Sequence, residues 1–181
     1  YTSEKILELS KDCDGILSSI TDQFNKDLIE KLSPTVKIIA NFAVGFGNID
    51  INAATKKNIA VTNTPEVLDD STADISILLL LGASRKVLEA RRAAELQNWK
   101  WSADFMLGKQ MSNKRLGILG MGRIGRAVAK RARGFNMEIH YHNRNQLSKN
   151  LEEGAIYHKT VKDLFNCSDF LSINCPATKE T

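Results

Sequence analysis

The stretch KRLGILGMGRIGRAVA, residues 114–129, decides the fold of this chain. Its apolar run LGIL, residues 116–119, has the length and composition of a buried strand. Three glycines follow with the spacing G-x-G-x-x-G, and good helix formers continue from Arg126 to Ala132. A strand, a glycine turn and a helix in this order predict the opening of a βαβ unit.

Each glycine of this turn has a separate physical task. Gly120 lets the chain leave the strand in a tight turn, Gly122 has no Cβ and lets a pyrophosphate approach the backbone, and Gly125 lets the helix pack close to the strand. The N–H groups and the positive dipole end of the helix then face the phosphates. The alternative is a glycine-rich turn that binds nothing.

Composition indicates a globular protein with a core. The chain has 181 residues, enough for one large or two small domains, and 43% of them are hydrophobic. The formal net charge of +4 is too small to indicate a nucleic-acid partner. We interpret Lys130, Arg131 and Arg133 as a solvated helix face, whereas Arg123 and Arg126 are placed to steer an anionic cofactor.

Three cysteines, Cys13, Cys167 and Cys175, show no metal-ligand spacing and no paired framework. We expect reduced, mostly buried thiols in a cytoplasmic protein. The longest apolar run, residues 75–83, is too short to span a bilayer, which takes about 20 residues, and predicts a buried helix instead. No signal peptide is recognised, and we expect the chain to be a piece of something longer, since Tyr1 falls inside an element and a strand with no closing element precedes Thr181.

Strands and helices alternate along the chain, which predicts an α/β protein with parallel sheets. Pro65 interrupts this alternation, so we divide the chain into residues 1–67 and 68–181. In the first part we expect helices at residues 3–9, 25–32 and 50–57 and strands at 14–19, 36–40 and 59–62; in the second, strands at 116–119, 137–142, 154–157 and 169–174 and a short helix at 161–165.

A single long helix is expected from Asp69 to about Trp99, because acidic residues open it. Its first half is nearly all apolar and should be buried, either against a second subunit or within one subunit. The aromatic connection that follows, with Trp101 and Phe105, either packs on its own domain or hooks over a partner.

The cofactor preference is indicated by the segment HYHNR, residues 140–144. A dinucleotide fold places an acidic residue about 20 residues past the first glycine, where it binds the ribose hydroxyl. Asn143 takes that place here and Arg144 follows it. An arginine can bind a 2′-phosphate, which a carboxylate would repel, so we expect NADPH in preference to NADH. The alternative is an exposed arginine with no phosphate nearby.

A second loop is expected at the same edge of the sheet. Residues 174–178, NCPAT, follow the last strand, and ligands of open α/β sheets bind beyond the carboxyl ends of the strands. Cys175 and Pro176 would then flank the adenosine or the nicotinamide half of the cofactor. Ordinary turn chemistry is the competing explanation.

These motifs together resemble the D-isomer-specific 2-hydroxyacid dehydrogenases. The matching stretches keep the family's order and spacing: VGFGNID at 44–50, VTNTP at 61–65, TAD at 72–74, LGILGMGRIG at 116–125 and NCPATKET at 174–181. The segment at 140–144 looks most like the glyoxylate/hydroxypyruvate reductase branch, which favours NADPH.

The resemblance implies a Rossmann-type doubly wound parallel sheet in residues 68–181, incomplete at its C-terminus, and a partial flavodoxin-like α/β substrate domain in residues 1–67. It implies a homodimer through residues 69–107, while the net charge and the short apolar run lead us to expect no nucleic acid or membrane as partner. It also assigns roles to single residues: Val44, Gly45, Phe46 and Gly47 to the substrate carboxylate, Thr72 to the nicotinamide pocket, and Arg123 and Ile124 to the pyrophosphate.

No catalytic residue is expected in this chain. The family's catalytic arginine, acidic residue and histidine lie beyond residue 181, and His140, His142 and His158 do not match the histidine's motif. The resemblance therefore implies a parent enzyme that reduces a small 2-keto acid, glyoxylate or hydroxypyruvate, and a fragment that binds cofactor without turnover. Two alternatives are a dinucleotide-sensing corepressor of the same family and a dehydrogenase of another specificity, such as phosphoglycerate, lactate or formate.

Overall fold

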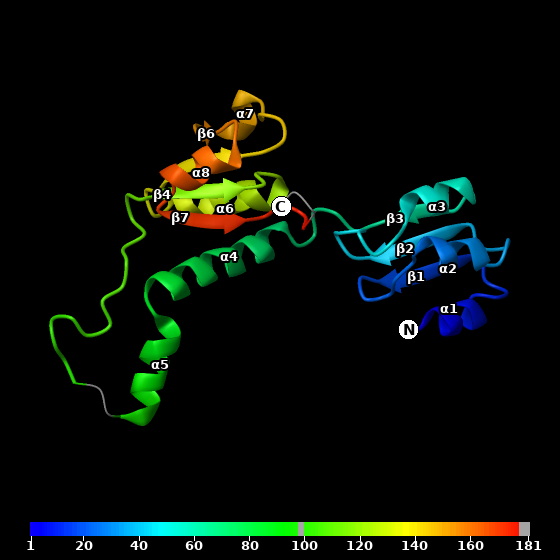
Figure 1. The fold of residues 1–181 in the computed structure, drawn as a ribbon, viewed down its shortest axis with the longest axis horizontal. Coiled ribbons are helices and arrows are strands. Elements are labelled where there is room, and N and C mark those ends of the chain that lie inside the picture. Colours follow the sequence, from blue (N-terminus) through cyan, green and yellow to red (C-terminus); the bar gives the residue numbers. More distant parts are fainter. Residues whose placement is uncertain (98–99, 178–181) are drawn as a thin grey trace. The chain divides into compact units, whose positions relative to one another are not determined.

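A computed structural model describes residues 1–97 and 100–177 of the chain (Figure 1). The chain divides into two compact units, Tyr1–Leu68 and Asp69–Thr181. Both units are α/β and both contain a parallel sheet, which confirms the fold class expected from the sequence.

The first unit contains three helices around a three-stranded sheet. The sheet has the order β1-β2-β3, and both of its strand pairs are parallel. In chain order the elements are α1 (Ser3–Leu9), β1 (Gly15–Ser19), α2 (Lys26–Lys31), β2 (Ile38–Phe42), α3 (Ile51–Lys56) and β3 (Ala60–Thr62).

Side-chain caps fix the helix starts of this unit. The side chain of Asn25 accepts a hydrogen bond from the N–H of Leu28 at the start of α2, and Asp50 accepts one from the N–H of Ala53 at the start of α3. At the other end of α2, the Lys57 ammonium donates to three backbone carbonyls. The bonds of Asn25 and Asp50 join residues three positions apart, which explains why both helix starts were predicted from the sequence.

Only one face of this sheet is covered by its helices. Ile39 is fully buried in a core with residues from α1, α2 and α3. Leu17 and Phe42, on the opposite face, are largely exposed. The first unit thus presents an open apolar sheet face.

The second unit has a four-stranded parallel sheet with the order β6-β5-β4-β7. This is the order of the first four strands of a doubly wound dinucleotide fold, in which the strand order reverses between the first and fourth strands. The elements are α4 (Asp69–Ser84), α5 (Val87–Leu96), β4 (Arg115–Leu119), α6 (Arg123–Arg133), β5 (Glu138–His142), α7 (Lys149–Glu152), β6 (Ile156–Tyr157), α8 (Val161–Cys167) and β7 (Phe170–Ile173). Helix α7 was not expected from the sequence.

Helices cover both faces of β4. Neighbouring residues of a strand point to opposite faces. A Cβ added at Gly117 would meet Ser168, directly after α8, whereas Ile118 packs with the buried face of α6. Helix α4 in turn packs on α6.

The prediction of one long helix from Asp69 to Trp99 is wrong, and Trp99 itself lies outside the described residues. Helix α4 ends at Ser84, and Lys86 adopts a left-handed conformation with φ of 52° before α5 begins. The carbonyl of Ser84 instead accepts a hydrogen bond from the N–H of Lys109, on the returning chain. This contact, distant in sequence, ends the helix.

Within this chain, the apolar half of α4 is buried on one side only. Ala73 is buried, and Ile77, Leu80 and Leu81 pack against the core. On the opposite side, Leu78 and Leu79 are 60% and 65% exposed. Helix α4 therefore has two apolar faces, and this unit covers one of them.

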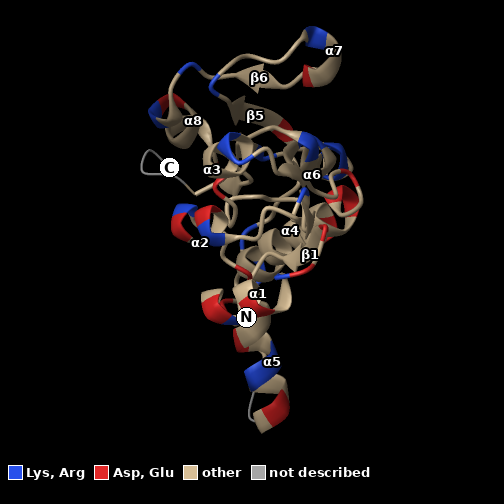
Figure 2. Cartoon of the chain, turned by 90° about the vertical axis from the view of Figure 1, so that its right-hand side faces the viewer, with Lys and Arg blue, Asp and Glu red and all other residues tan. Residues whose placement is uncertain are grey.

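Two expectations about polar side chains also need correction. The guanidinium of Arg131 pairs with Asp70 and Asp74 of α4, and Arg133 pairs with Glu153, so of the three expected solvated cations only Lys130 is simply exposed. Figure 2 shows blue segments along α6, at its lysine and arginine positions. The three cysteines are half-buried rather than mostly buried.

No helix in the described residues is long and apolar enough to cross a membrane.

Candidate functional site

The carboxyl ends of three strands meet at one edge of the four-stranded sheet. Leu119, the last residue of β4, lies opposite His142 of β5 and Ile173 of β7. The residues that follow these ends are Gly120, Asn143 and Asn174. The reversal of strand order falls between β4 and β7, which is where open α/β sheets bind their ligands.

The glycine turn has no room for side chains at two of its three glycines. Gly120 has φ of 90°, and a Cβ there would lie 2.7 Å from the backbone nitrogen of Cys175. A Cβ at Gly125 would lie 2.4 Å from the carbonyl oxygen of Gly120. A Cβ at Gly122, in contrast, would meet no atom within 4 Å. Gly122 therefore borders open space in front of α6.

The N-terminus of α6 opens onto this space. Gly122 is its N-cap and has no side chain, so the N-cap residue itself makes no side-chain hydrogen bond at the positive end of the helix. Arg123 is exposed in the first turn, Ile124 packs against the core, and the Arg126 guanidinium donates to the Gly122 carbonyl at 3.3 Å. This arrangement has the positive dipole and open backbone that a pyrophosphate needs.

Asn143 has a structural bond that the sequence did not reveal. Its side-chain oxygen accepts a hydrogen bond of 2.7 Å from the N–H of Met121, inside the glycine turn. The neighbouring N–H of Gly120 donates to the carbonyl of His142 at 3.0 Å. Asn143 therefore fixes the turn to the end of β5. No sequence signal distinguishes this bond from a contact with a ribose, since an amide suits both.

Arg144 follows on the surface. It is exposed, and its guanidinium makes no hydrogen bond or ion pair with another residue in the part of the chain that the structure describes. The side chain is thus available to an anion at the carboxyl end of β5.

The loop after β7 lies against the glycine turn. The N–H of Asn174 donates to the carbonyl of Leu119 at 2.8 Å, and the Cys175 backbone is in contact range of Gly120. Cys175 is half-buried and Pro176 is exposed. The structure therefore brings these two residues beside the glycines. In Figure 1, α4 begins at the same end of the sheet, and Thr72 is exposed in its first turn.

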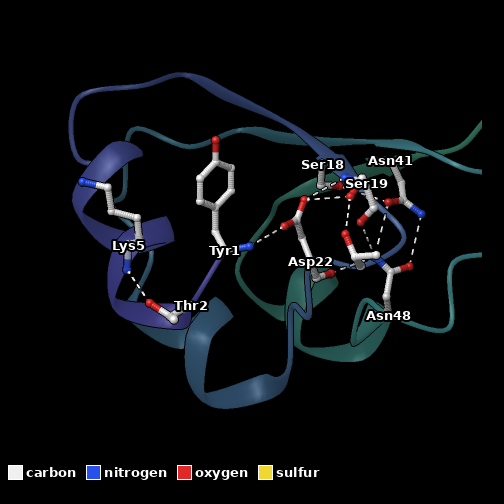
Figure 3. Close-up of polar contacts among 9 residues, drawn as sticks. Tyr1, Thr2, Lys5, Ser18, Ser19, Asp22, Asn41 and Asn48 are labelled. Atoms are coloured by element: carbon white, nitrogen blue, oxygen red, sulfur yellow. Dashed lines mark hydrogen bonds and ion pairs between the residues drawn. The ribbon is translucent and has the colours of Figure 1, made fainter.

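The loop predicted to receive the substrate carboxylate lies in the first unit and is held by one buried and one half-buried side-chain amide. The side-chain nitrogen of Asn41 donates to the carbonyl of Gly45 at 2.9 Å, and that of Asn63 donates to the carbonyl of Val44 at 2.8 Å. Figure 3 shows the bonds that hold Asn41: the Ser18 hydroxyl donates to its side-chain oxygen, and the amides of Asn41 and Asn48 bond to each other.

These contacts leave the donors of the loop open. Gly45, Phe46 and Gly47 are exposed, and their N–H groups donate to no other residue within the described ranges. The carbonyls of Val44, Gly45 and Phe46 accept hydrogen bonds, so the backbone of the loop is held while these N–H groups donate to no described residue. Successive open N–H groups form a concave anion site.

A cluster missed by sequence reasoning lies on the α8 side of the sheet. His140 Nδ1 is 2.9 Å from His158 Nε2, and Cys167 Sγ is 3.4 Å from the same nitrogen. Burial lowers the pKa of His158, and the nearby His140 adds to this shift. The irregular sequence spacing of the three residues gave no metal-site signal.

Two further shifted groups stabilise the second unit. The Arg115 guanidinium binds the Asp169 carboxylate and holds the pKa of Asp169 well below its usual range. Burial, together with a hydrogen bond to Glu152, raises the pKa of Tyr141 to about 12. Neither group lies in the glycine turn, and each bonds to another residue of the second unit, so we assign both to the stability of that unit.

Comparison with known proteins agrees with this geometry. Residues 77–181 match the model of the D-isomer specific 2-hydroxyacid dehydrogenase, NAD binding domain. The chain is 43% identical to the glyoxylate reductase of Thermococcus litoralis, with 97% of this chain and 54% of that protein covered. It is 34% identical to the glycerate dehydrogenase of Hyphomicrobium methylovorum, with 99% and 57% covered.

A solved structure gives the same result. The crystal structure of a glyoxylate reductase from Paecilomyes thermophila matches with a TM-score of 0.89 and 39% identity, over 98% of this chain and 56% of that one. The chain thus spans about half the length of the curated relatives it matches. The chain belongs to the D-isomer specific 2-hydroxyacid dehydrogenase family.

Proposed function

We propose that this chain supplies the cofactor site and the substrate-carboxylate loop of an NADPH-dependent enzyme that reduces glyoxylate or hydroxypyruvate to the 2-hydroxy acid. The observation that carries this proposal is the glycine turn at the reversal point of the sheet, with open space in front of Gly122. Residues 68–181 would bind the dinucleotide, and residues 1–67 would form part of the substrate domain.

The dinucleotide would lie along the carboxyl edge of the four-stranded sheet. Its pyrophosphate would bind at Gly122 and the first turn of α6, which includes Arg123 and Ile124. Thr72, Cys175 and Pro176 would line the rest of the site. When bound, the nicotinamide supplies the hydride that reduces the keto carbon. The residues of this chain hold the dinucleotide and orient it.

Arg144 is proposed to select NADPH. It is exposed at the carboxyl end of β5, and Asn143 contributes no negative charge there. A charge-assisted hydrogen bond to a 2′-phosphate is worth roughly 1.5–3 kcal/mol, or about ten- to a hundredfold in affinity. The side-chain oxygen of Asn143 accepts from Met121, and its amide nitrogen is an uncharged donor, so the charged contact with the phosphate falls to Arg144.

The substrate carboxylate would bind the open N–H groups of the loop formed by Val44, Gly45, Phe46 and Gly47. By resemblance to the family, the residues that bind the carbonyl and transfer the proton lie outside this sequence. We therefore expect the 181-residue chain to bind cofactor without turning over a keto acid. The reducing environment of the cytoplasm suits its three free cysteines.

The uncovered face of α4 is proposed to form a homodimer with α5 and the segment up to residue 107. Leu78 and Leu79 are exposed on α4, and Val87, Leu88 and Leu107 are exposed apolar side chains further along the chain. Leu79→Glu should convert a dimer to a monomer in analytical ultracentrifugation, because it places a charge in the interface. A wild-type chain that sediments as a monomer at all concentrations would contradict the dimer.

The cofactor proposal is tested by titrating the chain with NADPH and NADH and following quenching of its tryptophan fluorescence. We expect tighter binding of NADPH, reduced to the NADH level by Arg144→Ala. Lys130→Ala is the matched control, because it removes an exposed cation from the far end of α6 and should leave both affinities unchanged. Equal binding of both cofactors, unaffected by Arg144→Ala, would refute the NADPH preference, and binding of neither would refute the site.

A further inference from the structure

Three side chains with metal-binding atoms meet on the α8 face of the second unit. His140 lies on β5, His158 directly follows β6, and Cys167 ends α8. Their ligand atoms, Nδ1, Nε2 and Sγ, all lie within 4.8 Å of one another. We propose that His140, His158 and Cys167 form a binding site for a borderline-soft divalent metal ion, with Zn²⁺ as the natural occupant.

The spacing suits a tetrahedral ion. Zinc binds histidine nitrogen at about 2.0–2.1 Å and thiolate sulfur at about 2.3 Å, so neighbouring ligand atoms of a tetrahedron lie roughly 3.3–3.6 Å apart. The two nitrogens are 2.9 Å apart, and His158 Nε2 lies 3.4 Å from the sulfur. To admit an ion, the two imidazole nitrogens would separate by a few tenths of an ångström; Nδ1 of His140 and the sulfur, which lie within 4.8 Å of each other, would move to the tetrahedral spacing. A water would take the fourth position.

A carboxylate prepares His140 for this role. Nε2 of His140 lies 2.7 Å from a carboxylate oxygen of Glu138, which can only accept a hydrogen bond, so Nε2 carries the proton. In the neutral ring the lone pair is then on Nδ1, the atom that faces His158. Metal-binding histidines usually make this bond to a carboxylate through their other nitrogen. His140 is only 6% exposed, so a ligand there is shielded from solvent.

His158 is held in place from its backbone. Its N–H donates to the carbonyl of Tyr141 at 2.8 Å, and its own carbonyl is 2.8 Å from His142 Nδ1. Because both backbone groups are fixed to β5, the ring is positioned over His140. The mixed nitrogen and sulfur ligands favour zinc over magnesium or calcium, which prefer oxygen.

The proton balance of binding follows from the ligands. The Cys167 thiol releases its proton to solvent and binds as thiolate. The proton that His158 Nε2 shares with His140 Nδ1 moves to Nδ1 of His158, so that both facing nitrogens have a lone pair for the ion. One proton leaves for each ion bound. The ion would join β5, the segment after β6 and the end of α8. The competing arrangement is a hydrogen-bonded His–His–Cys chain without an ion, in which the thiol donates to the carbonyl of Leu164, 3.1 Å away.

The test is a titration of the reduced 181-residue chain with Co²⁺, followed by displacement with Zn²⁺. We expect one Co²⁺ per chain, with a thiolate-to-cobalt charge-transfer band in the near ultraviolet and the visible bands of a tetrahedral ion. Zn²⁺ should abolish these bands. The charge-transfer band should be absent in Cys167→Ser and unchanged in Cys13→Ser, a matched thiol variant in the first unit.

Glu138→Ala provides a graded variant, because loss of such a carboxylate partner typically weakens metal affinity about 10- to 100-fold without removing a ligand. The wild-type titration is decisive even if Cys167→Ser fails to fold. A wild-type chain without a saturable charge-transfer band would overturn the proposal, and so would a band that persists in Cys167→Ser or disappears in Cys13→Ser. None of these outcomes depends on cofactor binding.

Discussion

Gly122→Ala separates the fold of the glycine turn from its proposed function. Gly122 has φ of −78° and ψ of −151°, which alanine adopts readily, and an added Cβ would meet no atom within 4 Å. Gly-to-Ala changes at compatible positions stabilise a fold by about 0.4–1 kcal/mol. The variant should therefore fold at least as well as the wild type.

The same methyl group would occupy the space proposed for the pyrophosphate. If it keeps a phosphate from one backbone N–H at the start of α6, the loss is that of a hydrogen bond to a charged group, about 1.5–3 kcal/mol. Since every 1.4 kcal/mol is about tenfold in affinity, NADPH should bind about ten- to a hundredfold more weakly.

The assay combines urea denaturation with fluorescence titration by NADPH. Gly82→Ala is the matched control, because Gly82 lies within α4 and also has no atom near its absent Cβ. It should stabilise the chain by up to about 1 kcal/mol and leave cofactor affinity unchanged. A Gly122→Ala variant that binds NADPH as tightly as the wild type would refute the placement of the pyrophosphate.

Three further changes test the surrounding structure. Gly125→Ala should lower the free energy of unfolding by about 1–3 kcal/mol in urea denaturation, because its Cβ would lie 2.4 Å from the Gly120 carbonyl oxygen, and unchanged stability would contradict that packing. Asn41→Asp should lower the free energy of unfolding of the first unit by about 1–3 kcal/mol, because a carboxylate oxygen would face the two oxygens to which the buried amide nitrogen now donates. Amide hydrogen exchange in β2 should therefore be faster than in the wild type, and slower exchange would contradict this. Tyr141 should ionise at about pH 12 in an ultraviolet titration, with burial as the main cause. Because folding raises this pKa above the ordinary value of about 10, its stabilising effect is complete below pH 10 and is lost as the pH rises towards 12; Glu152→Gln should lower the pKa, and a Tyr141 that titrates near pH 10 would show that its hydroxyl is solvated.

Much of the local structure was readable from the sequence. The caps Asn25 and Asp50 act on residues three positions ahead, so both helix starts could be read from residue type and spacing. The strand before Gly120 and the helix after it were likewise predicted from composition and the glycine pattern. Shared strand ends then placed the glycine turn and the residue 174–176 loop at one edge.

The missed features depend on contacts between distant segments. Helix α4 ends where the returning Lys109 binds the carbonyl of Ser84, 25 positions earlier, and nothing in the intervening sequence indicates that bond. The bond from Met121 to Asn143 is of the same kind. The apolar content of α4 was visible in the sequence, but the number of its faces covered within the unit depended on the packing of α6.

The sequence by itself determined the alternation of elements, the helix caps and the glycine turn, because these follow from backbone conformations and hydrogen bonds among neighbouring residues. Only the tertiary structure decided which faces remain exposed, that Asn143 holds the turn, and that His140, His158 and Cys167 meet. Such contacts depend on which strands are neighbours, which the order β6-β5-β4-β7 describes, and on their register, which places His140 opposite Ile156.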